Sequence, residues 1–296
     1  MKANVRENVS GYLFILPVIL GLLVFTLTPF LLSFYYSFTD FDNLNPPNWV
    51  GLANFARMFG DENFWNSVKV TSIYAVVTVV LSLSLSFLLA LVLNLRYRGM
   101  KVFRVLLYTP VIIPGIAAAA IWGDMFNSTY VGIVNRFLSV FGIEPFPFFT
   151  SSKTALFSMI ILSLWGLGGN MLIWIAGFNG ISPSLYEAAE LDGAGRVRKL
   201  VSITLPMMTP VIFYNLVMGI ITALQAFGPA YLLTGGGPLD STNFLALNIY
   251  NTAIGRLEMV YASAQAWFLF VVIIGLTIVV FATSGWVYYG DGGDKA

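Results

Sequence analysis

The chain of 296 residues contains no cysteine and no histidine. These two absences exclude disulfides, thiolate nucleophiles and imidazole general bases, and they remove the usual ligands of haem and zinc. Charged residues make up only 10% of the chain, whereas a soluble domain carries about 25%. An oxygen-ligated metal site would need a cluster of carboxylates, and the sequence suggests none. The sequence therefore predicts neither a metal site nor a catalytic centre of the common kinds.

Motifs for hydrolysis and for ion-coupled transport are missing as well. The chain has no Gly-x4-Gly-Lys-Ser/Thr pattern, so it has no P-loop for nucleotide hydrolysis. The run LLTGGGP at 232–238 lacks the lysine and ends in proline, which predicts a tight turn. The apolar runs hold almost no ionisable residues, so a proton relay or an intramembrane hydrolase has no groups to use. Energy for any driven process would have to come from a partner.

What the chain does contain is hydrophobic residues, 58% of the total, arranged in long runs. A helix of about 20 apolar residues crosses a bilayer core of ~30 Å. The runs predict an all-α integral membrane protein with six transmembrane helices, at 12–38, 70–95, 105–126, 154–178, 210–233 and 266–289. Pro29 predicts a kink in the first helix, and Pro110 and Pro114 leave carbonyl groups unpaired in the third.

Two further patterns concern the first loop and the second span. Residues 40–65 are rich in turn residues, and their aromatic side chains predict a loop at the membrane interface: Trp49, Phe55, Phe64 and Trp65. In the second span, small side chains recur every four residues, at Thr78, Ser82, Ser86 and Ala90. This spacing predicts a face against which another helix packs closely.

The basic residues of the loops indicate the orientation. With six spans both termini share a side, and that side holds ten of the fifteen lysines and arginines: Lys2, Arg6, Arg96, Arg98, Lys101, Arg104, Arg196, Arg198, Lys199 and Lys295. Because basic residues concentrate in cytoplasmic loops, we expect both termini and residues 184–206 to be cytoplasmic. The net charge of +1 gives no indication of nucleic-acid binding.

Residues 184–206 form the longest polar stretch of the chain. Ser184 and Glu187 match a capping box that would begin a short helix, and Gly193 and Gly195 fit its termination by a left-handed residue. A second amphipathic segment follows at 197–205. The stretch could lie on lipid headgroups or dock a soluble partner, and its mixed charges favour a protein.

At these residues the sequence resembles a known family. EAAELDGA, followed by ITLP, is similar to the EAA motif of ABC-importer permeases, E-A-A-x-x-D-G-A and then I-x-L-P. The matching positions are Glu187, Ala188, Ala189, Asp192, Gly193, Ala194, Ile203, Leu205 and Pro206. The runs WVGLANF at 49–55 and LTGGGP at 233–238 resemble loops of the MalF-like subunit in sugar permeases of the maltose and glycerol-phosphate type. The chain lacks the extra N-terminal spans and the inserted outer domain of MalF, so it looks closer to the short, six-span relatives.

The resemblance implies the transmembrane domain of a type I ABC importer (MetI-like). In that family a second, MalG-like permease completes a heterodimeric pore, an ABC ATPase dimer docks on the EAA loops, and an extracytoplasmic solute-binding protein delivers the solute. The resemblance assigns the contact with the ATPase cleft to Glu187 and the turn of the coupling helix to Gly193. ATP and Mg²⁺ would then bind in the partner ATPase, and this chain would hold no cofactor.

The resemblance also implies a solute pathway. Its lining corresponds here to Val111, Gly115, Ser163, Gly166, Leu167, Asn170, Gly219 and Ala223. Because most of these side chains are small or apolar, we expect neighbouring residues to supply hydrogen bonds and an aromatic ring: Trp165, Thr222, Gln225 and Phe227. Small side chains along the pathway would leave room for a bulky solute such as an oligosaccharide. The alternative is that all of these residues serve helix packing.

Together these observations predict a non-catalytic permease subunit in the cytoplasmic (inner) membrane that carries a sugar, an oligosaccharide or a polyol by ATP-driven alternating access. The predicted parts are a cytoplasmic N-terminus (1–11), a transmembrane domain (12–289) that includes the coupling loop (184–206), and a cytoplasmic tail (290–296). A secondary carrier or channel that works without nucleotide is the alternative function.

Overall fold

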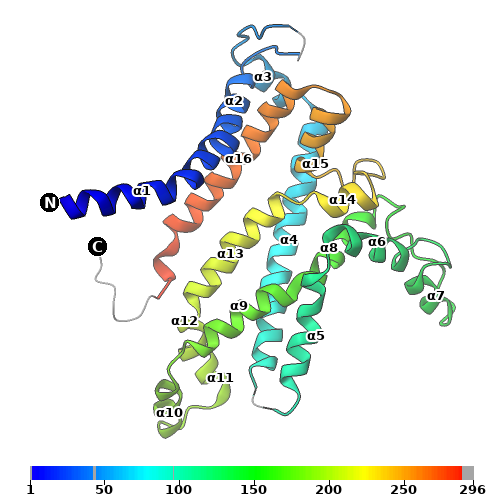
Figure 1. Ribbon diagram of the computed structural model, residues 1–296. Helices are drawn as coiled ribbons and strands as arrows, with labels where there is room; N and C mark the ends of the chain where they lie inside the picture. The colour runs from blue at the N-terminus through cyan, green and yellow to red at the C-terminus, as the bar shows by residue number, and fades with distance from the viewer. Residues whose placement is uncertain (1, 43–44, 96, 289–296) are drawn as a thin grey trace. The chain divides into compact units, whose positions relative to one another are not determined.

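The computed structural model describes residues 2–42, 45–95 and 97–288, with the side chains of residues 2–10 left out (Figure 1). The described residues form helices and connecting loops, and their one extended pairing is an isolated bridge between Thr39 and Trp49. The chain divides into two compact units. Unit 1 combines residues 1–62 with 249–270, and unit 2 combines residues 63–248 with 271–296. The predicted tail, 290–296, lies outside the described residues.

The six predicted spans correspond to helices of the structure. Among the described residues, five helical stretches are long and apolar enough to cross a membrane: Gly11–Tyr36, Glu62–Leu93, Ala155–Asn179, Thr209–Leu233 and Met259–Ala282. A sixth span arises if α5 (Met100–Ile112) and α6 (Gly115–Met125) count as one broken span, since they meet at an angle of 100°. The third apolar run is therefore sharply bent, and Pro114 stands at the bend as the N-cap of α6.

Unit 1 begins with α1 (Lys2–Leu22), a π-helical turn η1 (Leu23–Leu27) and α2 (Thr28–Tyr36). Pro29, which has no N–H to donate, lies in the first turn of α2. The regular helix is interrupted just before this proline, and Figure 1 shows the change of direction between α1 and α2. Helix α2 packs through Phe30 on the ring of Trp267, 4.6 Å between centroids.

The first loop contains a helix that the sequence did not predict, α3 (Ala53–Phe59). A polar cluster joins it to the start of α16 (Met259–Ala282). Arg57 pairs with Glu258 at 2.6 Å and lies over the ring of Tyr261, 4.1 Å from the centroid. The Tyr261 hydroxyl donates a hydrogen bond to Asp61 at 2.7 Å.

The second and sixth spans begin earlier than predicted. Helix α4 (Glu62–Leu93) starts eight residues before 70, and it buries Phe64 completely, so this ring does not lie at an interface. Helix α16 starts at Met259, seven residues before 266. In both cases polar residues near the start of the helix hid that start. Ser67 of α4 and Gln265 of α16 are typical of loops by residue type, yet both are buried in the fold.

In unit 2, the two central helical stretches are interrupted. The fourth span consists of α8 (Ala155–Ser163), a 3-10 turn η2 (Leu164–Gly166) and α9 (Leu167–Asn179). The fifth consists of α13 (Thr209–Leu224) and α14 (Gly228–Leu233). Shorter elements complete the chain: α7 (Ile133–Ser139), α15 (Leu245–Tyr250), the π-helical η4 (Asn251–Gly255) and the 3-10 turn η5 (Ser284–Trp286).

The core of unit 2 confirms the predicted packing face of α4 in its second half. Ser86 and Ala90 are completely buried, and the indole N–H of Trp174 on α9 donates a hydrogen bond to Ser86 Oγ at 2.8 Å. Helix α9 also approaches α5 very closely. A Cβ at Gly168 would lie 2.0 Å from the carbonyl oxygen of Leu107, so only glycine fits there.

Candidate functional site

The EAA segment, residues 184–206, folds as two helical pieces joined by a glycine corner. Helix α10 (Pro183–Leu191) has Asp192 as its C-cap, and the next residue, Gly193, terminates it with a φ of +72°, the left-handed conformation that glycine adopts readily. After the corner come α11 (Arg196–Lys199), the π-helical η3 (Leu200–Thr204) and α12 (Leu205–Met207). The prediction for Gly193 is correct. Gly195, with φ −70°, is instead the extended N-cap of α11.

The predicted capping box is wrong. Helix α10 begins one residue before Ser184, with Pro183 in its first turn and Ser182 as N-cap. Proline favours the first helical position because its fixed φ suits the helix and its missing N–H would be unpaired there. The Ser184 hydroxyl is 2.7 Å from that of Ser182, so the two serines bond to each other.

Two contacts hold the pieces of the EAA segment together. The hydroxyls of Tyr186 and Thr204 are 2.9 Å apart, and Lys199 Nζ donates to Glu190 Oε1. This hydrogen bond, with the positive charge behind it, lowers the pKa of the Glu190 carboxyl below its usual 4.5. The segment is also anchored to the membrane helices, because Tyr186 packs on the core cluster that contains Trp174. It therefore forms one connected body with the end of the helical bundle.

The predicted contact residues lie on the surface of this body. Glu187, Ala188, Asp192 and Gly193 are exposed, whereas Ala189 and Ala194 are half-buried. Two apolar side chains beside them are almost fully exposed, Leu191 at 90% and Val197 at 75%. Large exposed apolar side chains next to charges, at a position beyond the spans, are typical of a protein-binding surface.

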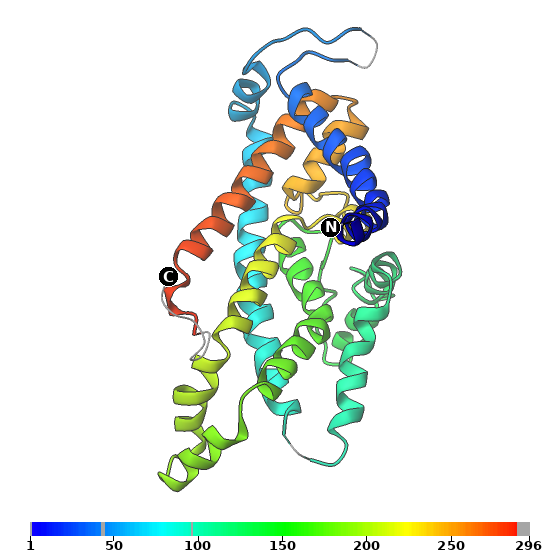
Figure 2. The ribbon, with the colours of Figure 1, turned by 60° about the vertical axis from the view of Figure 1, so that its left-hand side comes forward.

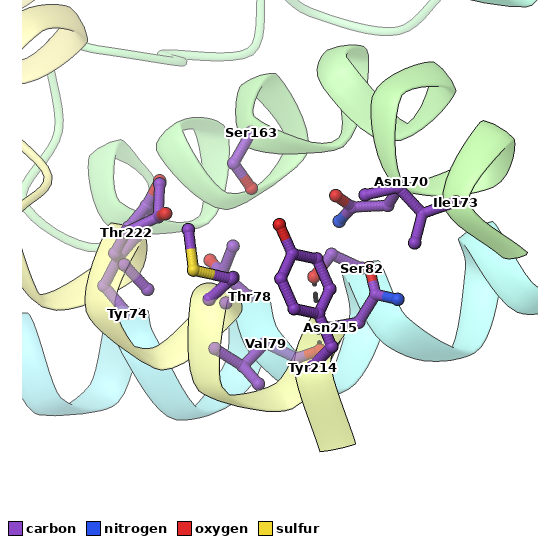
Figure 3. A pocket seen from close by; sticks show the side chains of 13 residues that line it. Tyr74, Thr78, Val79, Ser82, Ser163, Asn170, Ile173, Tyr214, Asn215 and Thr222 are labelled. Carbon is purple, nitrogen blue, oxygen red and sulfur yellow. Dashed lines mark hydrogen bonds between the residues drawn. The ribbon is translucent and has the colours of Figure 1, made fainter. Parts of the chain in front are cut away.

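A pocket of about 310 Å³ lies in unit 2 between α4, α8, α9 and α13. Figure 3 shows Ser163 and Asn170 on one side and the side chains of α4 and α13 on the other. Its polar lining is made of hydroxyl and amide groups: Tyr74, Thr78, Ser82, Ser163, Asn170, Tyr214, Asn215 and Thr222. None of the thirteen described lining residues carries a charge. The pocket can therefore exchange hydrogen bonds with a neutral polar molecule but cannot neutralise an ion.

The pocket brings together five of the twelve predicted pathway residues: Ser163, Asn170, Gly219, Thr222 and Ala223. The other seven lie elsewhere in unit 2. Val111 is near the end of α5, Gly115 follows the bend between α5 and α6, and Trp165 and Gly166 belong to the 3-10 turn η2. Leu167 begins α9, Gln225 is the C-cap of α13, and Phe227 is the N-cap of α14.

Trp165 lies in an aromatic group outside the pocket. Its ring packs edge-on against Trp122 of α6, with 5.1 Å between centroids. Trp122 in turn contacts Phe126, which stacks on Phe148. This group packs α6 against the 3-10 turn in the middle of the fourth span and against the loop that precedes the span.

Sequence reasoning missed the contribution of α4 to the pocket. Thr78 and Ser82 were assigned to helix packing, yet they line the pocket, whereas Ser86 and Ala90 on the same stripe do pack against a helix. Asn215 and Tyr214 of α13 were not singled out either. A polar side chain in the middle of an apolar run was the available signal for Asn215.

Comparisons with known proteins agree on one family. Residues 82–289 match the family described as "Binding-protein-dependent transport system inner membrane component". The probable ABC transporter permease protein YesP of Bacillus subtilis is 41% identical, over 96% of this chain and 93% of the relative. The trehalose/maltose transport system permease protein MalF of Thermococcus litoralis is 36% identical, over 94% of both chains. An sn-glycerol-3-phosphate permease protein, UgpA of Agrobacterium fabrum, is 32% identical over 94% of this chain and 95% of the relative.

Solved structures agree on the fold. A chain of a bacterial ABC transporter that imports the acidic polysaccharide alginate superposes with a TM-score of 0.83, at 24% identity, over 95% of this chain and 97% of that chain. A chain of the alginate transporter in complex with a periplasmic protein bound to an alginate pentasaccharide gives a TM-score of 0.85, over 96% and 97% of the two chains.

Proposed function

The chain belongs to the family of binding-protein-dependent transport system inner membrane components, and we propose that it is the MalF-like subunit of a type I ABC importer for a carbohydrate. As a family member it is a multi-pass permease of the inner membrane and a non-catalytic part of a transport system that depends on a binding protein. The further partners in the proposal are a second, MalG-like permease and a dimer of ABC ATPases. The proposal places both termini and the EAA segment in the cytoplasm.

The choice of solute in this proposal rests on the uncharged lining of the pocket. Sugars and polyols present many hydroxyl groups, and a wall of hydroxyls and amides can donate to them and accept from them. The relatives include permeases named for trehalose and maltose and for sn-glycerol-3-phosphate. A phosphorylated solute would need a cation or a set of N–H donors for its charge, and the described lining offers no cation. The proposal is therefore a neutral sugar, oligosaccharide or polyol.

The exposure of the EAA segment and its attachment to the core support a mechanism in which the partner ATPase drives this transport. Its exposed surface includes Glu187, Asp192 and Leu191, and it is tied to the core through Tyr186. An ATPase dimer that closes beneath it would move the segment as a rigid body. The attached ends of the spans would move with it, and the pocket would open to the other side of the membrane.

The test of coupling changes two residues of this surface: Glu187→Lys reverses a charge, and Gly193→Asp places a charged side chain at the left-handed glycine. In cells that express the complete transporter, Glu187→Lys and Gly193→Asp should abolish or strongly reduce ATP-dependent sugar uptake without lowering the amount of the chain in the membrane. Glu144→Lys is the matched control, because Glu144 is an exposed carboxylate outside the EAA segment. Normal uptake by both variants would show that the ATPase does not bind at this surface. Uptake that persists after ATP is depleted, with the proton gradient kept, would instead indicate a secondary carrier.

The test of the pocket uses two serines of one helix. Ser82 lines the pocket, whereas Ser84, two residues further along α4, is exposed and outside it. Ser82→Ala combined with Asn170→Ala should raise the KM for sugar uptake or lower binding-protein-stimulated ATP hydrolysis, and Ser84→Ala should leave both unchanged. Equal behaviour of the two sets would show that the solute passes elsewhere.

A further inference from the structure

A second pocket, of about 490 Å³, lies where α4 ends and α5 begins. We propose that it binds the headgroup of an anionic phospholipid. Its described lining contains three cations, Arg98, Lys101 and Arg104, and no carboxylate. The other lining residues are Asn94, Leu95, Tyr97, Gly99, Met100, Val102 and Asn179. The concentration of charge of one sign in a single concave site favours an anionic ligand.

The cations are available to such a ligand. Among the described residues, neither Arg98 nor Lys101 forms an ion pair, and both are exposed. Arg104 is held in place because its Nε and Nη2 donate to the carbonyl oxygen of Leu93 at 3.2 and 2.7 Å. Leu93 is the last residue of α4, so its carbonyl oxygen has no N–H group within the helix from which to accept a hydrogen bond. One guanidinium thus ties the first turns of α5 to the end of α4, and Arg104 also lines the pocket.

Apolar side chains around the pocket distinguish a lipid from a free anion. Leu95, 50% exposed, and Val102, 61% exposed, both line the pocket beside the cations. These side chains lie at the ends of two membrane helices, where acyl chains can cover them. Tyr97, 67% exposed, suits the headgroup level, where aromatic rings with a polar tip concentrate. Basic pockets between membrane helices bind acidic headgroups through this combination of charge and apolar surface.

The pocket is also next to the EAA segment. Leu95 lines both this pocket and a neighbouring groove, whose other walls are formed by Tyr186, Arg196 and Lys199. Figures 1 and 2 both show the connection between α4 and α5 at the same end of unit 2 as α10. A lipid bound there would contact the end of α4 that supports the EAA segment. Bound lipid should therefore stabilise the coupling region as well as occupy the pocket.

The experiment measures lipid retained by the purified complete transporter with native mass spectrometry. The probe is phosphatidylglycerol, with phosphatidylcholine as the neutral comparison. The double variant Arg98→Gln/Lys101→Gln should lose phosphatidylglycerol by about fivefold per charge removed, or about 25-fold in total. The matched control Arg136→Gln/Lys153→Gln removes two exposed charges far along the chain and should retain the lipid. The charge-preserving variant Arg98→Lys/Lys101→Arg should retain the lipid too, which would show that retention depends on the positive charge at these two positions.

Other outcomes would overturn the proposal. Equal retention by the double variant and its control would mean that the pocket does not select the lipid. Displacement of phosphatidylglycerol by inorganic phosphate in excess would indicate a site for small anions. Loss of the ATPase subunit from the double variant, with its lipid retained, would make the pocket a protein contact. Because binding is read without transport, a failure here is distinct from a failure of the proposed function.

Discussion

The close approach of α9 to α5 at Gly168 leads to a sharp prediction for Gly168→Ala. The added methyl group would lie 2.0 Å from the carbonyl oxygen of Leu107 and 2.8 Å from its carbonyl carbon. Real Cβ atoms are essentially never found within 3.0 Å of a heavy atom from a distant part of the chain. Both contacts are with backbone, which cannot rotate away as a side chain can, so the two helices have to separate by about 1 Å.

The magnitude follows from the balance of two effects. Alanine in place of glycine favours a helix by about 1 kcal/mol. Overpacking a well-packed contact costs about 1–3 kcal/mol, and a clash with rigid backbone belongs at the upper end of that range. We therefore expect a net loss of about 1–2 kcal/mol in the free energy of unfolding. Separation would also loosen the joint between the bent third span and the fourth.

The assay compares Gly168→Ala with Gly169→Ala by thermal unfolding of the purified transporter. At Gly169 the new methyl group would make an ordinary contact, 3.7 Å from a Val111 methyl, in the same turn of the same helix. Gly169→Ala should leave the Tm unchanged or slightly raised, whereas Gly168→Ala should lower it by a few degrees. Equal Tm values for the two variants would refute the close approach of α9 to α5.

Three further predictions concern polar contacts. Trp174→Phe removes the indole hydrogen bond between α9 and α4 and leaves a cavity in a buried site, so it should lower the free energy of unfolding by more than the ~1 kcal/mol of the hydrogen bond, measured as a lower Tm. Tyr261→Phe removes the bond to Asp61 and should lower the free energy of unfolding by about 1–3 kcal/mol, because the acceptor is charged; an unchanged Tm would contradict this. The lowered pKa of Glu190 gives a stabilisation that is complete above its ordinary 4.5 and is lost as the pH falls through the lowered value. Removal of its bond to Lys199 by Glu190→Gln should therefore flatten the acid side of the dependence of Tm on pH, by a small amount because the carboxylate is exposed.

The sequence predicted the membrane helices well because an apolar run of span length has few alternatives in a bilayer. It predicted their ends poorly. The first turns of α4 and α16 carry polar residues that the fold buries, such as Ser67 and Gln265, and local polarity reads as loop. Burial near the start of α4 depends on segments distant in the chain. Thr71, one turn after Ser67, accepts a hydrogen bond from the backbone N–H of Leu245.

The proline pair at 110 and 114 shows a second limit. Proline inside a helix removes a backbone hydrogen bond and predicts a kink, and the third span does bend at Pro114. Nothing local in the sequence sets the angle of 100°. The surroundings of α6 supply that information, since Trp122 packs against Trp165 and Gly123 against Leu233.

The stripe of small residues on α4 shows that a four-residue spacing identifies a helix face, but does not tell whether that face packs against another helix or lines a pocket. Opposite Ser86, the large ring of Trp174 fills the space, and the helices close into a core. Opposite Ser82, the facing side chains include Ser163 and Asn170, which are too short to fill it, and a pocket remains. The same four-residue period thus produces a packed contact in one half of the helix and a polar cavity in the other. The size of the residue on the partner helix decides between them, so a candidate pathway is found by comparing facing helices rather than by reading one helix alone.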